Sequence, residues 1–155
     1  RGNGKKMLFA GNGASNTIAT HSSLDITNQL AIPCLCFNDA SVITAYSNDF
    51  GYENSVERFV RLYGEDDCYV FISSSGESEN IVRAAEYVKS KNYKVITFTG
   101  FDNNNRVKQI GDVNFWVNST DYNIVENIHM IWLSMVCDMQ SHKEKEYIGI
   151  HGRNL

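Results

Sequence analysis

The sequence predicts an α/β domain built on a doubly wound, five-stranded parallel sheet flanked by helices. Short apolar, β-prone runs alternate five times with stretches of helical spacing along its 155 residues. Two units, at residues 7–30 and 69–88, each read as a strand, a tight turn and a helix. Strands joined by such right-handed crossovers lie parallel in one sheet. Ligands of these sheets bind beyond the carboxyl ends of the strands, so both turns lie where a site is expected.

The composition is that of an ordinary globular domain, and it argues against several function classes. Hydrophobic residues make up 43% of the chain, and the formal charge is −4, from 14 Lys and Arg against 18 Asp and Glu. The longest basic run is the pair Lys5-Lys6, so we expect no nucleic-acid partner. No apolar run approaches the length of a bilayer span and no leader peptide is recognisable, so we expect no membrane contact and a cytoplasmic location.

We expect one domain over residues 1–142, followed by a charged tail over residues 143–155. The single proline, Pro33, argues against a linker. None of the cysteines forms a Cys-x-x-Cys pair, so we expect small buried thiols in a reducing compartment rather than disulfides or a zinc site built from cysteine. They are Cys34, Cys36, Cys68 and Cys137.

Residues 73–78, Ser-Ser-Ser-Gly-Glu-Ser, form the strongest candidate binding site, here called the serine turn. Backbone N–H groups and hydroxyls at a helix N-terminus favour an anion, and phosphate is the natural ligand. Serines that only shape a turn and cap a helix are an equally ordinary explanation. Glu77 and Glu79 flank the turn. An inward carboxylate would repel phosphate, so the direction of these two side chains decides between the readings.

The other turn, residues 11–15, is Gly-Asn-Gly-Ala-Ser and is here called the glycine turn. The third glycine of the dinucleotide fingerprint is missing, with Asn16 at its place, so we expect no nucleotide cofactor. His21 and Asp25 are four residues apart on the following helix and share a face. They could be metal ligands, an acid and a base, or a surface pair without a role.

The remaining elements carry weaker signals. We expect a short helix at residues 42–46, a turn-rich loop at 47–53, and Asn54 as the cap of a helix at 55–63. The last helix should run over residues 122–139 behind a Ser-Thr-Asp cap. On that helix Glu126 and His129 are three residues apart. This spacing is used for metals, but a solvated Glu and a buried, hydrogen-bonded His explain it equally well.

Together, the glycine turn, His21, residues 47–53, the serine turn and the Ile-His pair on the last helix resemble the SIS (sugar isomerase) domain. The nearest branch is the phosphoheptose isomerases, which convert sedoheptulose 7-phosphate to D-glycero-D-manno-heptose 7-phosphate for surface polysaccharides. The resemblance covers roughly residues 7–140. It implies a five-stranded parallel sheet and a homotetramer that binds its substrate, a sugar phosphate, at subunit interfaces.

The resemblance also implies roles for individual residues. The family's phosphate-binding turn matches the serine turn, and other family positions near the sugar match residues in three further segments. The phosphate set is Ser73, Ser74, Ser75 and Ser78, and the sugar set is Asn12, Ser15, Asp39, Asn48 and Asp49. In the family, zinc ligands stand at the places of His21, Asp25, Glu126 and Ser134. A zinc ion on the first three is expected here, with Asp25 and His21 as catalytic residues.

Three positions depart from the family pattern. The family has Glu at the place of Asp25, Gln at Glu126, and His at Ser134. Asp25 could still serve as a general base, whereas a serine hydroxyl does not titrate near neutral pH. This chain therefore retains the family's phosphate-binding residues more fully than the family's proton-transferring residues. Two hypotheses follow: an aldose-ketose isomerase, or a non-catalytic module that binds sugar phosphates and has a regulatory or protein-binding role.

Overall fold

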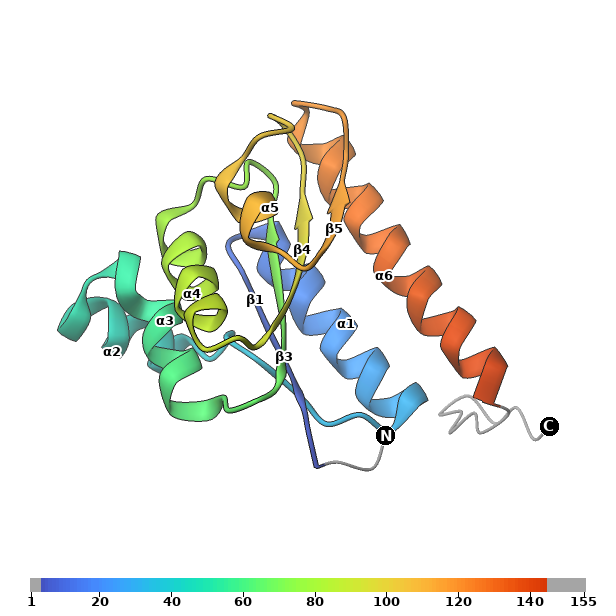
Figure 1. Cartoon of the computed structure of the whole chain (residues 1–155), viewed down its shortest axis with the longest axis horizontal. Coiled ribbons are helices and arrows are strands. Elements are labelled where there is room, and N and C mark those ends of the chain that lie inside the picture. The colour runs from blue at the N-terminus through green and yellow to red at the C-terminus, as the bar shows by residue number, and fades with distance from the viewer. Residues whose placement is uncertain (1–3, 145–155) are drawn as a thin grey trace.

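The structure, a computed structural model, describes residues 4–144 of the chain. Strands and helices alternate along this part, as the sequence predicts, except between the second and third strands, where two helices follow one another (Figure 1). In chain order the elements are β1 (Met7–Gly11), α1 (Ala14–Leu30), β2 (Cys34–Cys36), α2 (Ala40–Phe50), α3 (Tyr52–Tyr63), β3 (Cys68–Ser73), α4 (Glu79–Ser90), β4 (Lys94–Thr99), α5 (Arg106–Ile110), β5 (Val113–Trp116) and α6 (Tyr122–Glu144).

The five strands form one parallel sheet in the order β2-β1-β3-β4-β5, which confirms the predicted fold class. The chain steps from β1 outward to β2, then returns to the other side of β1 with β3. The order of the strands therefore reverses between β1 and β3, where Gly11 pairs with Ile72. Ligands of doubly wound sheets bind at this reversal, beyond the carboxyl ends of the strands. The glycine turn and the serine turn both begin there.

Two helical layers cover the sheet because neighbouring strand residues point to opposite faces. Phe9 and Val70 pack under α1 and α6, together with Ile18 and Leu133 from those helices. Residues of the opposite parity, such as Leu8, pack under α3, α4 and α5. Figure 1 shows α1 and α6 side by side on one face of the sheet. The site at the reversal is thus bordered by the starts of α1, α4 and α6.

The segment between β2 and β3 is more helical than predicted. The expected loop at residues 47–53 is wrong, because α2 runs on through Phe50 and α3 begins at Tyr52. Gly51 alone separates the two helices, with φ of 84°. Asn54 does not cap α3; it lies inside the helix, and its side chain donates to the carbonyl of Phe50 at 2.7 Å. The polar residues of this segment suit a loop by composition, and α2 has no buried residue to mark its continuation as a helix.

The last helix is longer than predicted. The last helix begins at Tyr122 as predicted but continues to Glu144, so the predicted tail from residue 143 overlaps it, and residues 145–155 lie outside the described part.

Cys137 is buried, whereas the other three cysteines are only half-buried. All four are free thiols. Within residues 4–144, no helix has both the length and the apolar character needed to cross a membrane.

Candidate functional site

A pocket of about 310 Å³ opens at the strand reversal, and we call it the serine pocket. Its walls come from the glycine turn, the serine turn and the first turn of α6. The lining residues are Asn12, Gly13, Ala14, Ser15, Ile72, Ser73, Ser74, Ser75, Ser78, Tyr122 and Glu126. Six of the nine residues that the resemblance assigns to phosphate or sugar, all those in the two turns, therefore surround one cavity.

Two hydroxyls of the serine turn shape the turn, because Ser73 and Ser75 accept from the backbone N–H groups of Gly76 and Glu77 at 3.2 Å, and the other two have little role in the fold. Ser78 stands at the N-cap of α4, yet its side chain makes no capping hydrogen bond. Its hydroxyl only accepts a long contact of 3.4 Å from Ser73. The Oγ of Ser74 is buried and has no hydrogen-bond partner among the described residues. Because buried polar groups are normally paired, an unpaired hydroxyl in a pocket wall indicates a ligand or water there. Turn formation and capping alone therefore do not account for the Ser74 hydroxyl.

Asn12 is held in the pocket wall by residues from two other helices. Its side-chain amide pairs reciprocally with that of the buried Asn80 on α4, through two hydrogen bonds of 2.9 Å. Tyr52, the first residue of α3, donates to the Asn12 oxygen at 2.8 Å. Asn80 also accepts from the backbone N–H of Ile81 at 3.0 Å. The glycine turn is therefore fixed relative to the serine turn before any ligand binds.

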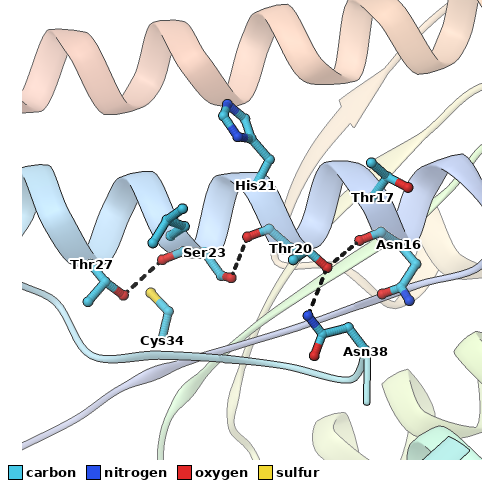
Figure 2. A pocket seen from close by; sticks show the side chains of 9 residues that line it. Asn16, Thr17, Thr20, His21, Ser23, Thr27, Cys34 and Asn38 are labelled. Carbon is cyan, nitrogen blue, oxygen red and sulfur yellow. Dashed lines mark hydrogen bonds between the residues drawn. The ribbon is translucent and has the colours of Figure 1, made fainter. Parts of the chain in front are cut away.

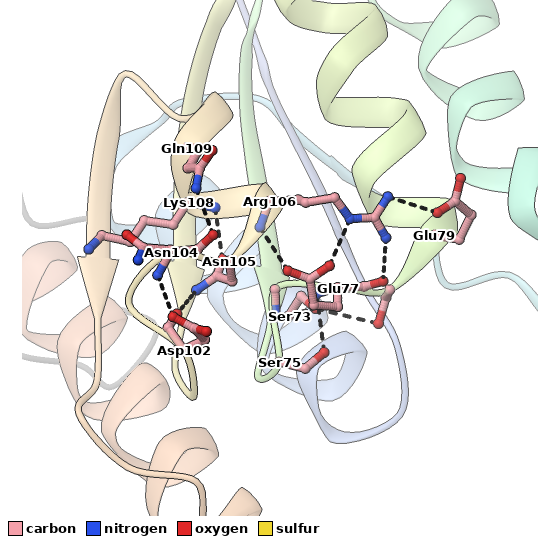
Figure 3. Close-up of polar contacts among 12 residues, drawn as sticks. Ser73, Ser75, Glu77, Glu79, Asp102, Asn104, Asn105, Arg106, Lys108 and Gln109 are labelled. Carbon is pink, nitrogen blue, oxygen red and sulfur yellow. Dashed lines mark hydrogen bonds and ion pairs between the residues drawn. The ribbon is translucent and has the colours of Figure 1, made fainter.

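Glu77 and Glu79 both point away from the pocket, which answers the question the sequence leaves open. Figure 3 shows both carboxylates directed to Arg106, the first residue of α5. Glu77 binds the Arg106 guanidinium at 2.7 Å, and Glu79 binds it at 3.0 Å. Hydrogen bonds from Arg106 lower the pKa of Glu77, and hydrogen bonds from Arg83 and Arg106 lower the pKa of Glu79. The acids flanking the serine turn are ionised but neutralised by arginine, so they do not oppose an anion.

His21 and Asp25 form a pair on α1, outside the serine pocket. The Nε2 of His21 lies 3.3 Å from an Asp25 oxygen, and the His21 side chain is half exposed. His21 lines a separate shallow groove of about 800 Å³ along α1 and β2 (Figure 2). Hydroxyls in this groove bond back to the helix: Thr20 donates to the Asn16 carbonyl at 2.9 Å, and Thr27 donates to the Ser23 carbonyl at 2.8 Å.

Comparison with known proteins gives consistent relatives. The SIS domain family matches residues 2–100. A phosphoheptose isomerase of Buchnera aphidicola subsp. Acyrthosiphon pisum is 35% identical over 150 residues, covering 89% of this chain and 77% of the relative. Structures of phosphoheptose isomerases from Neisseria gonorrhoeae and Francisella tularensis have TM-scores of 0.83 and 0.80 at 28% and 31% identity, each covering 88% of this chain and 76% of the other.

This chain belongs to the SIS domain family, in its phosphoheptose isomerase branch. The resemblance inferred from the motifs is thereby confirmed, together with the five-stranded sheet. Among the described residues of this SIS domain, no three His, Cys, Asp or Glu side chains lie close enough to hold a metal ion. The expected set of His21, Asp25 and Glu126 is therefore not assembled. Glu126 lies one turn into α6 at the serine pocket, whereas His21 lies two turns down α1.

Three of the expected sugar-binding residues lie away from the serine pocket of the same chain. Asp39 is the N-cap of α2 and accepts from the backbone N–H of Val42 at 3.0 Å. Asn48 and Asp49 are exposed near the end of that helix, where the Asn48 amide donates to Asp49 at 2.9 Å. A capping role accounts for Asp39. For the exposed pair, Asn48 and Asp49, no contact in the described part of the chain indicates a structural role.

Two residues at or beside the serine pocket, Tyr122 and Asn80, were not singled out from the sequence. Tyr122 lines the serine pocket, and its place directly after the Ser-Thr-Asp cap of a helix that follows β5 could have indicated it. Asn80 is a polar residue within the apolar face of α4, which is a weak signal of a buried amide pair. His129 is fully buried with its Nε2 at 3.0 Å from the Thr99 carbonyl, and burial lowers its pKa. The buried, hydrogen-bonded explanation of His129 is confirmed.

Proposed function

We propose that this SIS domain is a cytoplasmic aldose-ketose isomerase that interconverts sedoheptulose 7-phosphate and D-glycero-D-manno-heptose 7-phosphate. The relatives named phosphoheptose isomerase support the choice of reaction. The single structural observation that carries phosphate binding is the buried Ser74 hydroxyl, which has no partner within residues 4–144 and lines the serine pocket. A phosphate oxygen would supply the missing hydrogen bond.

The serine turn suits a phosphate ester by both charge and geometry. Its hydroxyls stand at the N-terminus of α4, where the helix dipole and free backbone N–H groups favour an anion. The flanking glutamates are turned away and paired with arginine. With the phosphate at the serines, the sugar chain would extend along the glycine turn toward Asn12 and the first turn of α6.

The isomerisation needs a base that moves a proton between two neighbouring carbons, and a donor that protonates the carbonyl oxygen. The base we expect from the sequence is Asp25, which is oriented by its contact with His21. The serine pocket adds a second candidate, because Glu126 and Tyr122 are the titratable side chains that line it. Glu126 could remove the proton, and the Tyr122 phenol could hydrogen-bond the oxygen. Variants at Asp25 and Glu126 therefore decide which carboxylate is the base.

Zinc is a separate question. Imidazole and carboxylate groups suit this ion, so the chemistry of the expected ligands is appropriate. Their placement in the described chain is not, since Glu126 stands apart from the pair of His21 and Asp25. The steps above are therefore assigned to side chains alone.

We also propose that the domain works as a homo-oligomer, a tetramer by its family resemblance. Large apolar side chains on α6 remain exposed at helical spacing, and the ones that share a face are Ile124, Ile131, Met135 and Met139. Such a stripe on a single chain is typical of a surface that packs against another copy. In an assembly of this kind, the exposed pair Asn48 and Asp49 would be available to the serine pocket of a neighbouring subunit.

A non-catalytic module that binds sugar phosphates is the second candidate. It is favoured by Ser134, which stands half-buried on α6 where the family has a histidine. The phosphate pocket would be the same under both hypotheses, and only the proton transfer would differ.

The test is calorimetric titration with sedoheptulose 7-phosphate, using the wild type and the double variant Ser74→Ala, Ser75→Ala. Loss of binding in the double variant is expected, because two hydroxyls of the phosphate site are removed. Ser90→Ala is the matched control, since that hydroxyl lies at the far end of α4 and donates to the Tyr87 carbonyl. Unchanged affinity in the double variant would refute both candidate functions.

A further inference from the structure

Arg106, the first residue of α5, holds the serine turn by hydrogen bonds to Glu77. Arg106 makes three hydrogen bonds to Glu77: its backbone N–H donates to Oε1 at 2.9 Å, its Nε donates to Oε2 at 2.7 Å, and its Nη2 donates to the Glu77 carbonyl at 3.1 Å. Figure 3 shows these bonds spanning the gap between α5 and the turn. Guanidinium–carboxylate pairs with several bonds fix geometry better than single contacts do. We call this arrangement the Arg106 clamp.

The clamp rests on a rigid base. Asn105, the residue before Arg106, is buried and donates to the carbonyls of Gly100 and Asp102 at 3.2 and 2.7 Å. The backbone N–H of Val107 donates to the Gly76 carbonyl at 3.1 Å. A single rigid unit, the β4–α5 connection, therefore holds the turn through both Gly76 and Glu77.

The clamp also controls charge at the edge of the pocket. Glu77 and Glu79 bring two carboxylates to the residues around the serine turn, and Arg106 contacts both. Within the described residues, Glu79 is the acid that forms an ion pair with Arg83, and Arg83 also donates a hydrogen bond to the Asn54 side chain. Without Arg106, Glu77 would keep no cationic partner in this part of the molecule. The negative charge of Glu77 would then repel a phosphate ester, which itself carries up to two negative charges.

We propose that Arg106 is a positioning residue of the phosphate site: through Glu77 it holds the serine turn in its ligand-ready shape and cancels the carboxylate charge beside the pocket. The shape-holding part stands on the contacts alone. The charge-cancelling part rests on the proposed function, because it requires a phosphate ester as the ligand.

The first arm of the experiment needs no ligand. Amide hydrogen exchange is measured for the peptide that spans residues 73–80, in the wild type, in Arg106→Gln and in Arg106→Lys. Faster exchange is expected in both variants, because Lys keeps the charge but loses the fork of donors. The control is Lys5→Gln, which breaks the exposed Lys5–Asp66 pair of 2.6 Å at the opposite end of the strands and should leave the peptide unchanged. Unchanged exchange in Arg106→Gln would overturn the proposal.

The second arm measures the dissociation constant and the kinetic constants for sedoheptulose 7-phosphate. Arg106→Gln should weaken binding by about tenfold and raise KM, with kcat nearly constant, since one unpaired carboxylate then lies beside the phosphate site. Adding Glu77→Gln to that variant removes the unpaired charge and should restore part of the affinity. The loss should also shrink as salt is raised, which a purely structural defect would not show.

The outcomes separate the two claims. A wild type that does not bind the sugar phosphate refutes the proposed function and with it the charge-cancelling part, while exchange still decides whether Arg106 holds the turn. If the 73–80 peptide of Arg106→Gln exchanges its amide hydrogens faster, yet the variant binds sedoheptulose 7-phosphate as tightly as the wild type, the clamp does not serve the phosphate site. The proposal is then overturned. Faster exchange, weaker binding and recovery in the double variant together support it.

Discussion

Replacing Gly76 by alanine tests how firmly the serine turn is seated. Gly76 has φ of +67°, and an added Cβ would lie 1.9 Å from the Oδ1 of Asn105. The backbone conformation alone should cost about 1–2 kcal/mol. The overlap cannot be relieved cheaply, because Asn105 is buried and its Oδ1 caps α5 by accepting from Lys108 at 2.9 Å. Moving it sacrifices this cap and at least one buried hydrogen bond, which brings the loss to about 3–5 kcal/mol.

The assay is thermal unfolding followed by circular dichroism. For a domain of this size, each kcal/mol lowers Tm by about 2–4 °C, so Gly76→Ala should lower it by roughly 6–20 °C. Gly4→Ala is the control for backbone strain alone, because Gly4 has φ of +68° and open space around its Cβ position. A second check is Asn105→Ala, which removes the two Asn105 atoms nearest the added Cβ, at 1.9 and 2.2 Å, and leaves only the Asn105 Cβ at 2.7 Å. Gly76→Ala should cost less in that background than in the wild type.

A fall in Tm for Gly76→Ala no larger than that for Gly4→Ala would refute this reasoning. It would mean that the turn shifts away from α5 without loss, so the β4–α5 connection would not be a rigid base for the serines.

Three further predictions concern the reaction, the assembly and the core. Asp25→Asn and Glu126→Gln are compared in the isomerase assay: the variant that abolishes turnover while retaining sugar-phosphate binding marks the base, and full activity in both would contradict a carboxylate base. Met135→Glu should reduce the oligomer mass seen in sedimentation, with Gln140→Glu as the neutral control on the same helix. His129 has a lowered pKa through burial, so the unfolded state takes up its proton first. The advantage of the wild type over His129→Gln in unfolding free energy should therefore shrink from pH 7.5 to 5.5, and a constant difference would contradict this.

Much of the fold could be predicted because its signals are local. Strand runs that end in Gly-rich or Ser-rich turns before a helical pattern occur at the glycine turn and the serine turn, and both units appear as expected. The segment around Gly51 was the main error. A helix was predicted at residues 42–46, within α2. The polar residues after it suit a loop by composition, and α2 has no buried residue, so hydrophobic spacing did not show that the helix continues to Phe50.

The site was predictable where its residues follow the carboxyl ends of parallel strands. Asn12 of the glycine turn and the serines of the serine turn could be grouped, although they are far apart in the sequence, because parallel strands end at one edge. Contacts across the fold could not be read in this way. The partner of Glu77 lies 29 residues away, so the direction of the glutamates depends on Arg106 and not on their own segment. The distance of Glu126 from His21 likewise follows from how far each stands along its helix.

The most direct test of isomerase activity is incubation of the purified protein with sedoheptulose 7-phosphate in deuterated water. We expect that the aldose forms, that solvent deuterium enters the sugar at the carbon that exchanges its proton, and that both disappear in the Ser74→Ala, Ser75→Ala variant. Tight binding of the sugar phosphate with no deuterium incorporated would contradict an isomerase. The serine pocket would then belong to a domain that binds its ligand without transforming it.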